Sequence, residues 1–409
     1  MEINQSASKI MQQANKLAEF TAMEGGLLRA YLTPEHRQAH QQIADWMTEA
    51  GLQVWEDSVG NQWGRKVASN PTLPTLMIGS HSDTVANAGK YDGNLGVLLA
   101  IEAMQVLSDI DLPFNIDIVA FADEEGTRFN TTLIGSSAVA GCFQSNWLDI
   151  EDNDGISMRQ AMLDFGLQPE IAGHDQYTKE QLLAYLEVHI EQGPVLESKD
   201  LAVGVVTAIA GAKRYQFNVR GMAGHAGTVP LDLRQDALCG VAQMISSIEY
   251  FASNHDVVAT VGKCEVKPGA VNVIPGEVNF TLDIRSQDQA ILESSCVTLL
   301  NQLEAIAQER QLTFQSEKIY QAEAVPCNSK LQQQWAEVVE QQTQKEACLL
   351  HSGAGHDAMV IAKIADIAML FVRCEKGISH NPREQVMTSD VGVALTCLVE
   401  MVKKLAVSG

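Results

Sequence analysis

The hydrophobic positions of the first two hundred residues fall into short continuous runs that alternate with helical stripes. Three apolar runs have the length of strands and lie at residues 74–80, 115–122 and 182–190. Between the first two, residues 95–107 place Val97, Ile101 and Met104 on one helical stripe. Strands that are apolar on both faces and alternate with helices are typical of a parallel sheet covered on both sides. This region is therefore predicted to be an α/β domain with a mostly parallel sheet.

The pattern changes from about residue 211. An amphipathic helix is predicted at 234–255, followed by antiparallel strands and a second helix at about 287–310. Strand, helix, two strands, helix, strand is the order of a small ferredoxin-like α+β domain. After residue 325 the α/β pattern returns with a buried strand and a closing helix. We predict an α/β domain interrupted by an inserted α+β domain, with the boundaries 1–210 and 325–409 for the former and 211–324 for the latter.

The charge of the chain argues against nucleic acids and anionic membranes as binding partners. The chain has 51 acidic and 28 basic residues and a net charge of -23, which would repel nucleic acids and anionic membranes. Its eight cysteines form no Cys-x-x-Cys pair, and the N-terminus lacks the layout of a secretory signal. No apolar run reaches the length of a membrane span. We expect a cytoplasmic protein that binds neither nucleic acid nor membrane.

Acidic residues and histidines follow several of the predicted strands, where parallel sheets place their chemistry. Each is weak evidence alone, because a histidine after a buried strand is more often structural and an aspartate beside glycines is usually a turn residue. Three consecutive acids after an apolar run are harder to dismiss, because such a cluster needs a cation to offset the repulsion. The candidates are His81, Asp92, Asp123, Glu124, Glu125, His189 and His380.

This set of imidazoles and carboxylates without a thiolate suits two divalent cations that share a bridging carboxylate, with Mn²⁺, Zn²⁺ or Co²⁺ as the metal. A two-metal site can polarise a carbonyl and activate water near neutral pH. One acid must then stay unligated to act as the general base. Of the adjacent Glu124 and Glu125, one can be the base and the other a metal ligand.

Six motifs, in register, resemble the M20 metallopeptidase-like family and, within it, the ureido-hydrolysing branch: "GSHSDTV", "YDGNLGV", "ADEEGTRF", "HIEQGPVLE", "GHAGTVPLDLRQDAL" and "GISHNP". The resemblance implies a metallo-exopeptidase type of catalytic domain and an inserted domain that acts as lid and dimer contact. It also implies Asp92 as the bridging ligand, Glu124 as general base, and Asp83 as the acceptor that orients the His81 imidazole. The implied metal ligands are His81, Asp92, Glu125, His189 and His380.

An anionic substrate needs local cations to overcome the charge of the chain, and Arg214, Arg285 and His225 are candidates. The resemblance implies that Asn272 and Arg285 bind the substrate carboxylate, with Arg214 and Gln192 also in contact with substrate. It further implies that His225 stabilises the oxyanion from the partner subunit of a homodimer.

The resulting hypothesis is an amidohydrolase with two divalent ions per subunit, Mn²⁺ or Zn²⁺, with Co²⁺ or Ni²⁺ as alternatives. The favoured substrate is allantoate, cleaved to ureidoglycine, ammonia and CO₂ in purine nitrogen catabolism. The nearest alternative is hydrolysis of N-carbamoyl-L-amino acids or β-ureidopropionate. A dipeptidase ranks third, because peptidase members usually carry a carboxylate where this chain has His189. An inactive binding protein would require a defect in this machinery, and the motifs contain none.

Two other segments contain histidines. Residues 351–358, "HSGAGHDA", are interpreted either as a strand-to-helix turn or as part of a shell that orients substrate. Thr33 and Pro34 predict the start of a helix on which His36 and His40 lie one turn apart. We expect these two histidines on a solvated face rather than on a metal.

Overall fold

The computed structural model describes residues 3–408 and divides into two compact units. The first unit comprises the chain up to Thr207, Cys327–Leu350 and the residues from Ala354 on. The second unit comprises Ala208–Pro326 and His351–Gly353, and so contains the segment 211–324 that the sequence predicts as an insertion.

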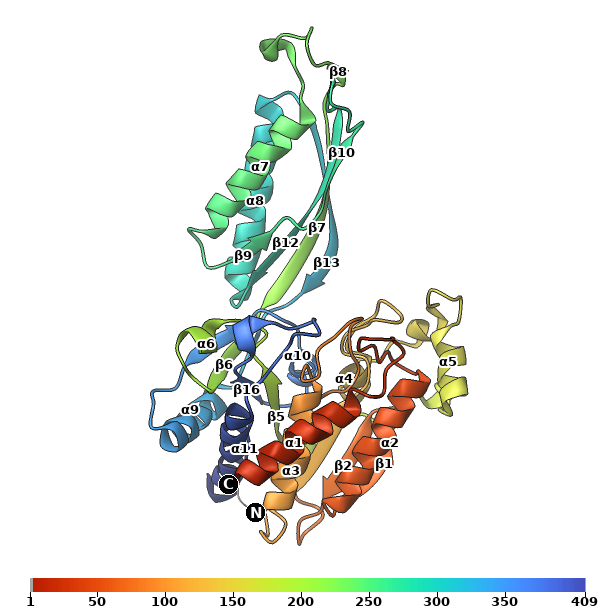
Figure 1. Cartoon of the computed structure of the whole chain (residues 1–409), viewed down its shortest axis with the longest axis vertical. Helices are drawn as coiled ribbons and strands as arrows, with labels where there is room; N and C mark the ends of the chain where they lie inside the picture. The colour runs from red at the N-terminus through yellow and green to blue at the C-terminus, as the bar shows by residue number, and fades with distance from the viewer. Residues whose placement is uncertain (1–2, 409) are drawn as a thin grey trace. The chain divides into compact units, whose positions relative to one another are not determined.

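A nine-stranded sheet has the order β1-β2-β4-β3-β5-β16-β6-β14, with β15 also paired to β6 (Figure 1). Its four central strands are parallel, and the outer pairs β1–β2, β2–β4, β16–β6 and β6–β14 are antiparallel. The strands are β1 (Gln53–Glu56), β2 (Gln62–Lys66), β3 (Thr75–His81), β4 (Asn115–Phe121), β5 (Leu182–Ile190), β6 (Val203–Ile209), β14 (Val325–Pro326), β15 (Leu349–Ser352) and β16 (Ile367–Val372). The prediction of a mostly parallel sheet is confirmed for these central strands.

The helices of the first unit are α1 (Ile3–Leu17), α2 (Pro34–Glu49), α3 (Asn94–Val106), α4 (Ile134–Val139), α5 (Met158–Phe165), α6 (Val195–Ser198), α9 (Ser329–Thr343), α10 (Ala358–Ile361) and α11 (Thr388–Ser408). Among the described residues of the chain, no helix is long and apolar enough to cross a membrane.

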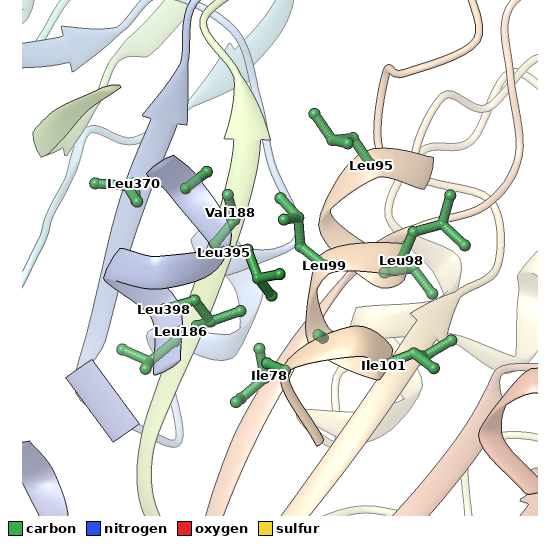
Figure 2. Packing of buried hydrophobic residues seen from close by; sticks show 14 of the residues in the cluster. Ile78, Leu95, Leu98, Leu99, Ile101, Leu186, Val188, Leu370, Leu395 and Leu398 are labelled. Atoms are coloured by element: carbon green, nitrogen blue, oxygen red, sulfur yellow. The ribbon is translucent and has the colours of Figure 1, made fainter. Parts of the chain in front are cut away.

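Helix α3 lies at the centre of the main hydrophobic core. Every residue from Asn94 to Met104 is buried, because β3 and β5 pack on one side of the helix and α1 and α11 on others. Leu98 and Leu99 contribute to the same core as Ile78 of β3 and Leu395 of α11 (Figure 2). The single stripe predicted from the sequence is therefore too narrow. A helix enclosed on all sides needs apolar residues around its whole circumference.

Helix α2 begins as predicted, since the Thr33 hydroxyl accepts a hydrogen bond from the main-chain N–H of His36 at 3.3 Å. The expectation of a solvated face for the two histidines is wrong. His36 and His40 are both 0% exposed, with 2.9 Å between their Nε2 atoms. His40 Nε2 also lies 2.6 Å from the hydroxyl of Ser82, the residue after β3, so this face of α2 supports the end of the strand.

The second unit contains an antiparallel sheet with the order β10-β12-β7-β13, and β9 pairs with β12. Residues of β12 alternate between buried and half-buried, and the buried side packs against α7 and α8. A separate two-stranded antiparallel sheet, β8–β11, lies beyond one end of this sheet (Figure 1). The elements are β7 (Gly211–Arg220), β8 (Gly224–His225), α7 (Ala237–Ala252), β9 (Val258–Thr260), β10 (Cys264–Lys267), β11 (Val273–Ile274), β12 (Glu277–Ser286), α8 (Gln289–Glu309) and β13 (Thr313–Ala322).

Candidate metal centre

The carboxyl ends of the parallel strands bring together the candidate ligands of the first unit. His81 is the last residue of β3, His189 is the penultimate residue of β5, and Glu125 follows β4. Because β4, β3 and β5 are neighbours and run parallel, their ends lie at the same edge of the sheet. The sequence-based expectation that these residues lie close together matches the geometry.

Asp92 reaches the same edge from the loop between β3 and α3. Gly93, with φ of 64°, follows it, and a Cβ atom there would lie 2.5 Å from the His81 ring. Only glycine combines this left-handed backbone with so close an approach to an imidazole. The glycine-rich sequence of this loop is therefore needed to place the Asp92 carboxylate beside His81.

Two sets of potential ligand atoms share Asp92. One consists of His81, Asp92 and His189 and the other of Asp92, Glu125 and His380, and the ligand atoms of each set lie within 4.8 Å of one another. Asp92 Oδ1 is 3.6 Å from His81 Nε2 and 3.2 Å from His189 Nε2, whereas Asp92 Oδ2 is 3.2 Å from His380 Nε2. One oxygen of Asp92 thus faces each set, as expected of a carboxylate that bridges two cations.

The donor chemistry of these residues fits two divalent metal ions. Imidazole nitrogen and carboxylate oxygen without thiolate suit Zn²⁺ or Mn²⁺. Asp92 Oδ1 is buried and has no hydrogen-bond partner within residues 3–408, so it is available as a ligand. Burial alone would raise the pKa of Asp92, but the imidazoles of His189, His380 and His81 hold it well below its usual value. The group therefore stays ionised, as a bridging ligand must.

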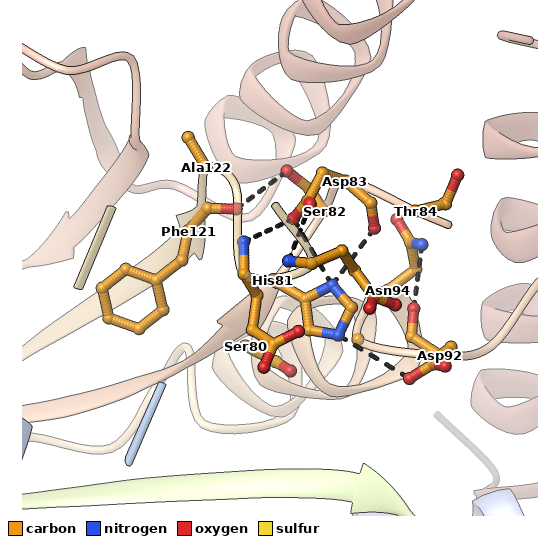
Figure 3. Close-up of polar contacts among 12 residues, drawn as sticks. Ser80, His81, Ser82, Asp83, Thr84, Asp92, Asn94, Phe121 and Ala122 are labelled. Carbon is orange, nitrogen blue, oxygen red and sulfur yellow. Dashed lines mark hydrogen bonds and ion pairs between the residues drawn. The ribbon is translucent and has the colours of Figure 1, made fainter. Parts of the chain in front are cut away.

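Two main-chain carbonyls orient the buried imidazoles. His81 Nδ1 lies 3.1 Å from the main-chain oxygen of Asp83, and His189 Nδ1 lies 2.9 Å from that of Ile190 (Figure 3 shows the former). Both rings therefore direct Nε2 towards Asp92, since donation from one ring nitrogen fixes the tautomer of the other.

The Asp83 carboxylate differs in detail from the expectation. Its Oδ1 atom is 3.5 Å from His81 Nδ1, farther away than the main-chain oxygen of the same residue. Instead, its two oxygens accept hydrogen bonds from the main-chain N–H groups of Glu124 and Glu125, at 3.0 and 3.1 Å. Asp83 therefore holds the segment that carries the candidate base, as well as lying beside the imidazole.

Glu124 lies at the edge of the first ligand set. Its carboxylate is within 4.8 Å of ligand atoms of His81 and Glu125. Burial raises the pKa of Glu124 well above its usual value, opposed by the His81 imidazole and reinforced by Glu125. A carboxylate with a raised pKa can accept a proton and return it, which is what general base catalysis requires.

Gln192 contacts the candidate bridge directly, because its Nε2 atom donates to Asp92 Oδ2 at 3.0 Å. Its other terminal atom, Oε1, has no hydrogen-bond partner among residues 3–408. This acceptor lies beside the candidate metal centre, consistent with the expectation that Gln192 contacts substrate.

The four candidate substrate-binding residues of the second unit form two pairs. His225 ends β8 and Asn272 directly precedes its partner strand β11, and the main-chain N–H of Ala226 donates to the Asn272 carbonyl at 3.0 Å. Arg214 and Arg285 lie on the sheet, and both bind Asp283, with Nε–Oδ distances of 2.8 and 2.7 Å. Two guanidinium groups thus share one carboxylate, that of Asp283. Arg285 also lines a cavity of about 580 Å³ in this unit.

Several supporting residues were not identified from the sequence. Arg29 is fully buried and donates to the main-chain oxygen of Ser82 at 2.8 Å and to Asn94 Oδ1 at 2.8 Å. Glu384 accepts from the main-chain N–H groups of Tyr91 and Asp92. Neither residue follows a strand or belongs to a histidine motif, and pattern alone gives no sign that a charged side chain is buried.

Residues 354–358 of the segment 351–358, which belong to the first unit, also lie close to the centre. His356 and Asp357 are buried, and the His356 ring centroid is 4.5 Å from that of His189. His356, His189 and Glu187 form a further group whose ligand atoms lie within 4.8 Å of one another. The geometry places His356 against a candidate ligand and is compatible with both interpretations of this segment.

Comparison with known proteins agrees with this geometry. Peptidase family M20/M25/M40 matches residues 77–404. The chain is 38% identical over 411 residues to allantoate deiminase of Arabidopsis thaliana, covering 92% of this chain and 78% of that protein. It is also 38% identical over 386 residues to an N-carbamoyl-L-amino-acid amidohydrolase of Pseudomonas sp. (strain NS671), covering 93% of each.

Among solved structures, an amidase of the hydantoinase/carbamoylase family from Burkholderia multivorans superposes with a TM-score of 0.92 at 31% identity, covering 98% of each chain. M20 enzymes typically use a dinuclear metal site, and the two ligand sets that share Asp92 provide the residues for one. The chain therefore belongs to the peptidase family M20/M25/M40 and is a hydrolytic enzyme of its amidohydrolase type.

Proposed function

We propose that this enzyme hydrolyses a ureido C–N bond of a small carboxylate, with allantoate as the favoured substrate. The observation that carries the proposal is the pair of ligand sets joined by Asp92 with Glu124 beside them. Its relatives in Arabidopsis and Pseudomonas are named for activity on allantoate and on N-carbamoyl-L-amino acids, both of which are ureido compounds. His189, at a position where peptidase members usually have a carboxylate, favours the amidohydrolase reaction.

When bound, a metal pair at this site would polarise the ureido carbonyl and lower the pKa of water. Glu124 accepts the proton of the attacking water and delivers it to the leaving nitrogen. Asp83 fixes the main chain of Glu124 so that the carboxylate stays at the edge of the ligand set. Gln192 Oε1, which lacks a partner among the described residues, is the acceptor for an N–H of the ureido group.

Arg285 and Arg214 supply the positive charge that the substrate carboxylate needs. Each binds Asp283, so two guanidinium groups share one carboxylate on the sheet of the second unit. Arginine can form two parallel hydrogen bonds to a carboxylate, which suits this recognition. Asn272 lies beside His225, away from Arg285, so its amide is proposed to reach the substrate carboxylate together with His225 from a second subunit.

His225 is proposed to act on the substrate of a second subunit. Arg220 pairs with Glu277 at the end of β12 that lies nearer the β8–β11 pair, while Arg285 lies eight residues farther along β12. At roughly 3.3 Å per residue these eight residues span about 26 Å, more than the length of a small ureido acid. This separation supports the proposal that His225 and Arg285 of one chain act on different substrate molecules, and that a homodimer brings the two groups to one substrate.

The test is a substrate panel with protein that has been stripped of metal by a chelator and reloaded with Mn²⁺. Ammonia release from allantoate is compared with amino-acid release from several N-carbamoyl-L-amino acids and from a dipeptide. Preference for allantoate is expected. Preference for N-carbamoyl amino acids would transfer the proposal to the alternative substrate, and preference for the dipeptide would refute ureido hydrolysis.

Glu124→Gln tests the mechanism in the same assay. The amide cannot accept the proton, so turnover is expected to fall about 10²- to 10⁴-fold, the usual contribution of a general acid–base group. Metal content should remain near that of the wild type, since Glu124 is the base rather than one of the five proposed ligands. Wild-type activity in this variant would contradict the assigned role.

A further inference from the structure

Glu384 is a buried carboxylate outside the two ligand sets that share Asp92. It is 3% exposed and lies four residues after His380. Its Oε1 atom accepts hydrogen bonds from the main-chain N–H groups of Tyr91 at 2.8 Å and Asp92 at 3.2 Å. One carboxylate oxygen therefore fixes the main chain of the candidate bridging residue from a segment almost three hundred positions away.

The second oxygen of Glu384 connects to the same bridge through a serine. Ser379 Oγ lies 3.0 Å from Glu384 Oε2 and 2.8 Å from Asp92 Oδ2. Ser379 directly precedes His380, whose Nε2 atom is 3.2 Å from Asp92 Oδ2. Glu384 is thus linked to both the main chain and the side chain of Asp92, and to the residue beside His380.

The loop that carries Asp92 packs directly on this carboxylate. A Cβ atom at Gly89 would lie 2.2 Å from the carboxyl carbon of Glu384, so the main chain can approach this closely only at a glycine. The sequence of the loop is therefore suited to this contact, because Gly89 leaves space for the Glu384 carboxylate and Tyr91 and Asp92 donate hydrogen bonds to it.

We infer that Glu384 is a positioning residue that clamps the Asp92 segment to the Ser379–His380 segment and so sets the geometry of the second ligand set, Asp92, Glu125 and His380. The inference rests on the proposed metal centre. Its physical basis is that residues which orient metal ligands through hydrogen bonds contribute to metal affinity without touching the ion. A residue with only a structural role would change the stability of the protein and leave metal affinity unaltered.

The experiment uses the full chain after treatment with a chelator, titrated with Mn²⁺ while free Mn²⁺ is measured by electron paramagnetic resonance. Glu384→Ala removes the acceptor of both main-chain N–H groups, and the affinity for one of the two ions is expected to fall about 10- to 100-fold. Glu384→Gln keeps an oxygen for those N–H groups and an amide that can donate to Ser379, so its affinities are expected to lie close to the wild-type values.

Asp57→Asn is the matched control. Asp57 is also a buried carboxylate that accepts two main-chain N–H groups, those of Val59 and Asn61, but these lie in its own loop. Its substitution should lower the thermal stability and leave Mn²⁺ affinity unchanged. Circular dichroism and thermal unfolding of the metal-free variants identify any loss of fold.

If Glu384→Ala does not fold, Ser379→Ala provides the second test, because it removes the hydroxyl between Glu384 and Asp92 and should weaken binding of the same ion. Wild-type affinity in the variant that folds would overturn the inference, as would an equal loss in Glu384→Ala and Glu384→Gln. A wild-type protein that binds no Mn²⁺ would overturn the metal centre and the inference together. Two bound ions without ureido hydrolysis would refute the proposed function and leave the role of Glu384 standing.

Discussion

The two units hold their candidate functional side chains in different ways. In the first unit, His81, Asp92 and His189 are buried and contact one another at the end of the parallel sheet. In the second unit, His225 and Asn272 are exposed at the β8–β11 pair, far along the sheet from Arg285. The difference shows that the candidate metal centre is held together by contacts within the first unit, whereas the candidate recognition residues lie at separate places on the second unit.

The exposed residues near His225 support this distinction. Met222, Leu231, Leu233 and Val271 are all strongly exposed, Val271 completely so. Met222 and Val271 each lie two residues before a strand of the β8–β11 pair, and exposed apolar patches are typical of surfaces that contact another protein. By contrast, Asp92 Oδ2 accepts hydrogen bonds from the Gln192 amide and the Ser379 hydroxyl, both within the first unit.

The largest effect is expected from a substitution that removes the candidate metal centre of the first unit. Asp92→Ala takes away the only residue shared by the two ligand sets described above, leaving two members in each. We expect fewer than one metal ion per chain by elemental analysis and a loss of activity beyond about 10⁴-fold, the upper end of the contribution of a single acid–base group. Asp45→Ala, an exposed aspartate on α2, is the control. Retention of two ions in Asp92→Ala would contradict the bridging role.

A smaller effect, confined to recognition, is expected in the second unit. Arg285→Met should raise KM about 10- to 100-fold, because a hydrogen bond to a charged group contributes about 1.5–3 kcal/mol. Metal content should not change. Arg220→Met is the matched control, since Arg220 pairs with Glu277 at the opposite end of β12 and lies outside the proposed carboxylate site. An unchanged KM for Arg285→Met, or an equal rise in both variants, would remove Arg285 from substrate recognition.

The smallest effect concerns the buried histidines that support the end of β3. Burial lowers the pKa of His36 well below its usual value and that of His40 to about 3. Both are thus neutral in the folded protein at a pH where the unfolded chain binds protons. These groups therefore make stability fall as the pH falls below about 6.5, by about 1.4 kcal/mol per pH unit for each histidine.

The measurement is the free energy of unfolding of the metal-free protein in urea between pH 7 and pH 5. Buried carboxyl groups such as Asp57, whose pKa burial raises to about 6, have the opposite effect, so wild type is compared with His40→Gln. Between pH 6 and pH 5, the pH dependence of the variant should differ from that of the wild type by about the contribution of one histidine. Identical pH dependence would show that His40 is not kept neutral by the fold.

Much of the fold could be predicted because the relevant patterns are local. The predicted strand at 115–122 corresponds to β4 (Asn115–Phe121), and the predicted strand at 182–190 has the same bounds as β5. Apolar runs of this length are typical of strands that are buried on both faces of a parallel sheet. The pattern involves only residues close together in the sequence, so it can be recognised without the structure. The prediction was least accurate for α3 and for His36 and His40, where burial depends on helices that pack from distant parts of the chain.

The candidate metal centre was predictable for a related reason. Strand ends can be located from the sequence, and the parallel order places His81, Glu125 and His189 at one edge. What the sequence could not indicate is which atoms face one another. The nearest acceptor of His81 Nδ1 is a main-chain oxygen, and the Asp83 carboxylate, 3.5 Å from the same nitrogen, also binds the main chain of Glu124 and Glu125.

The amino-acid sequence alone determined the alternation of strands and helices, the interruption by an α+β segment and the residue types at the strand ends. These follow from the local periodicity of strands and helices and from motifs of a few residues. Only the tertiary structure decided that the two oxygens of Asp92 face different ligand sets and that Glu384 fixes the main chain of Asp92. The contact between Glu384 and Asp92 joins residues 292 positions apart. Such a contact arises from the packing of the whole unit, and no periodic pattern of residues in the sequence indicates it.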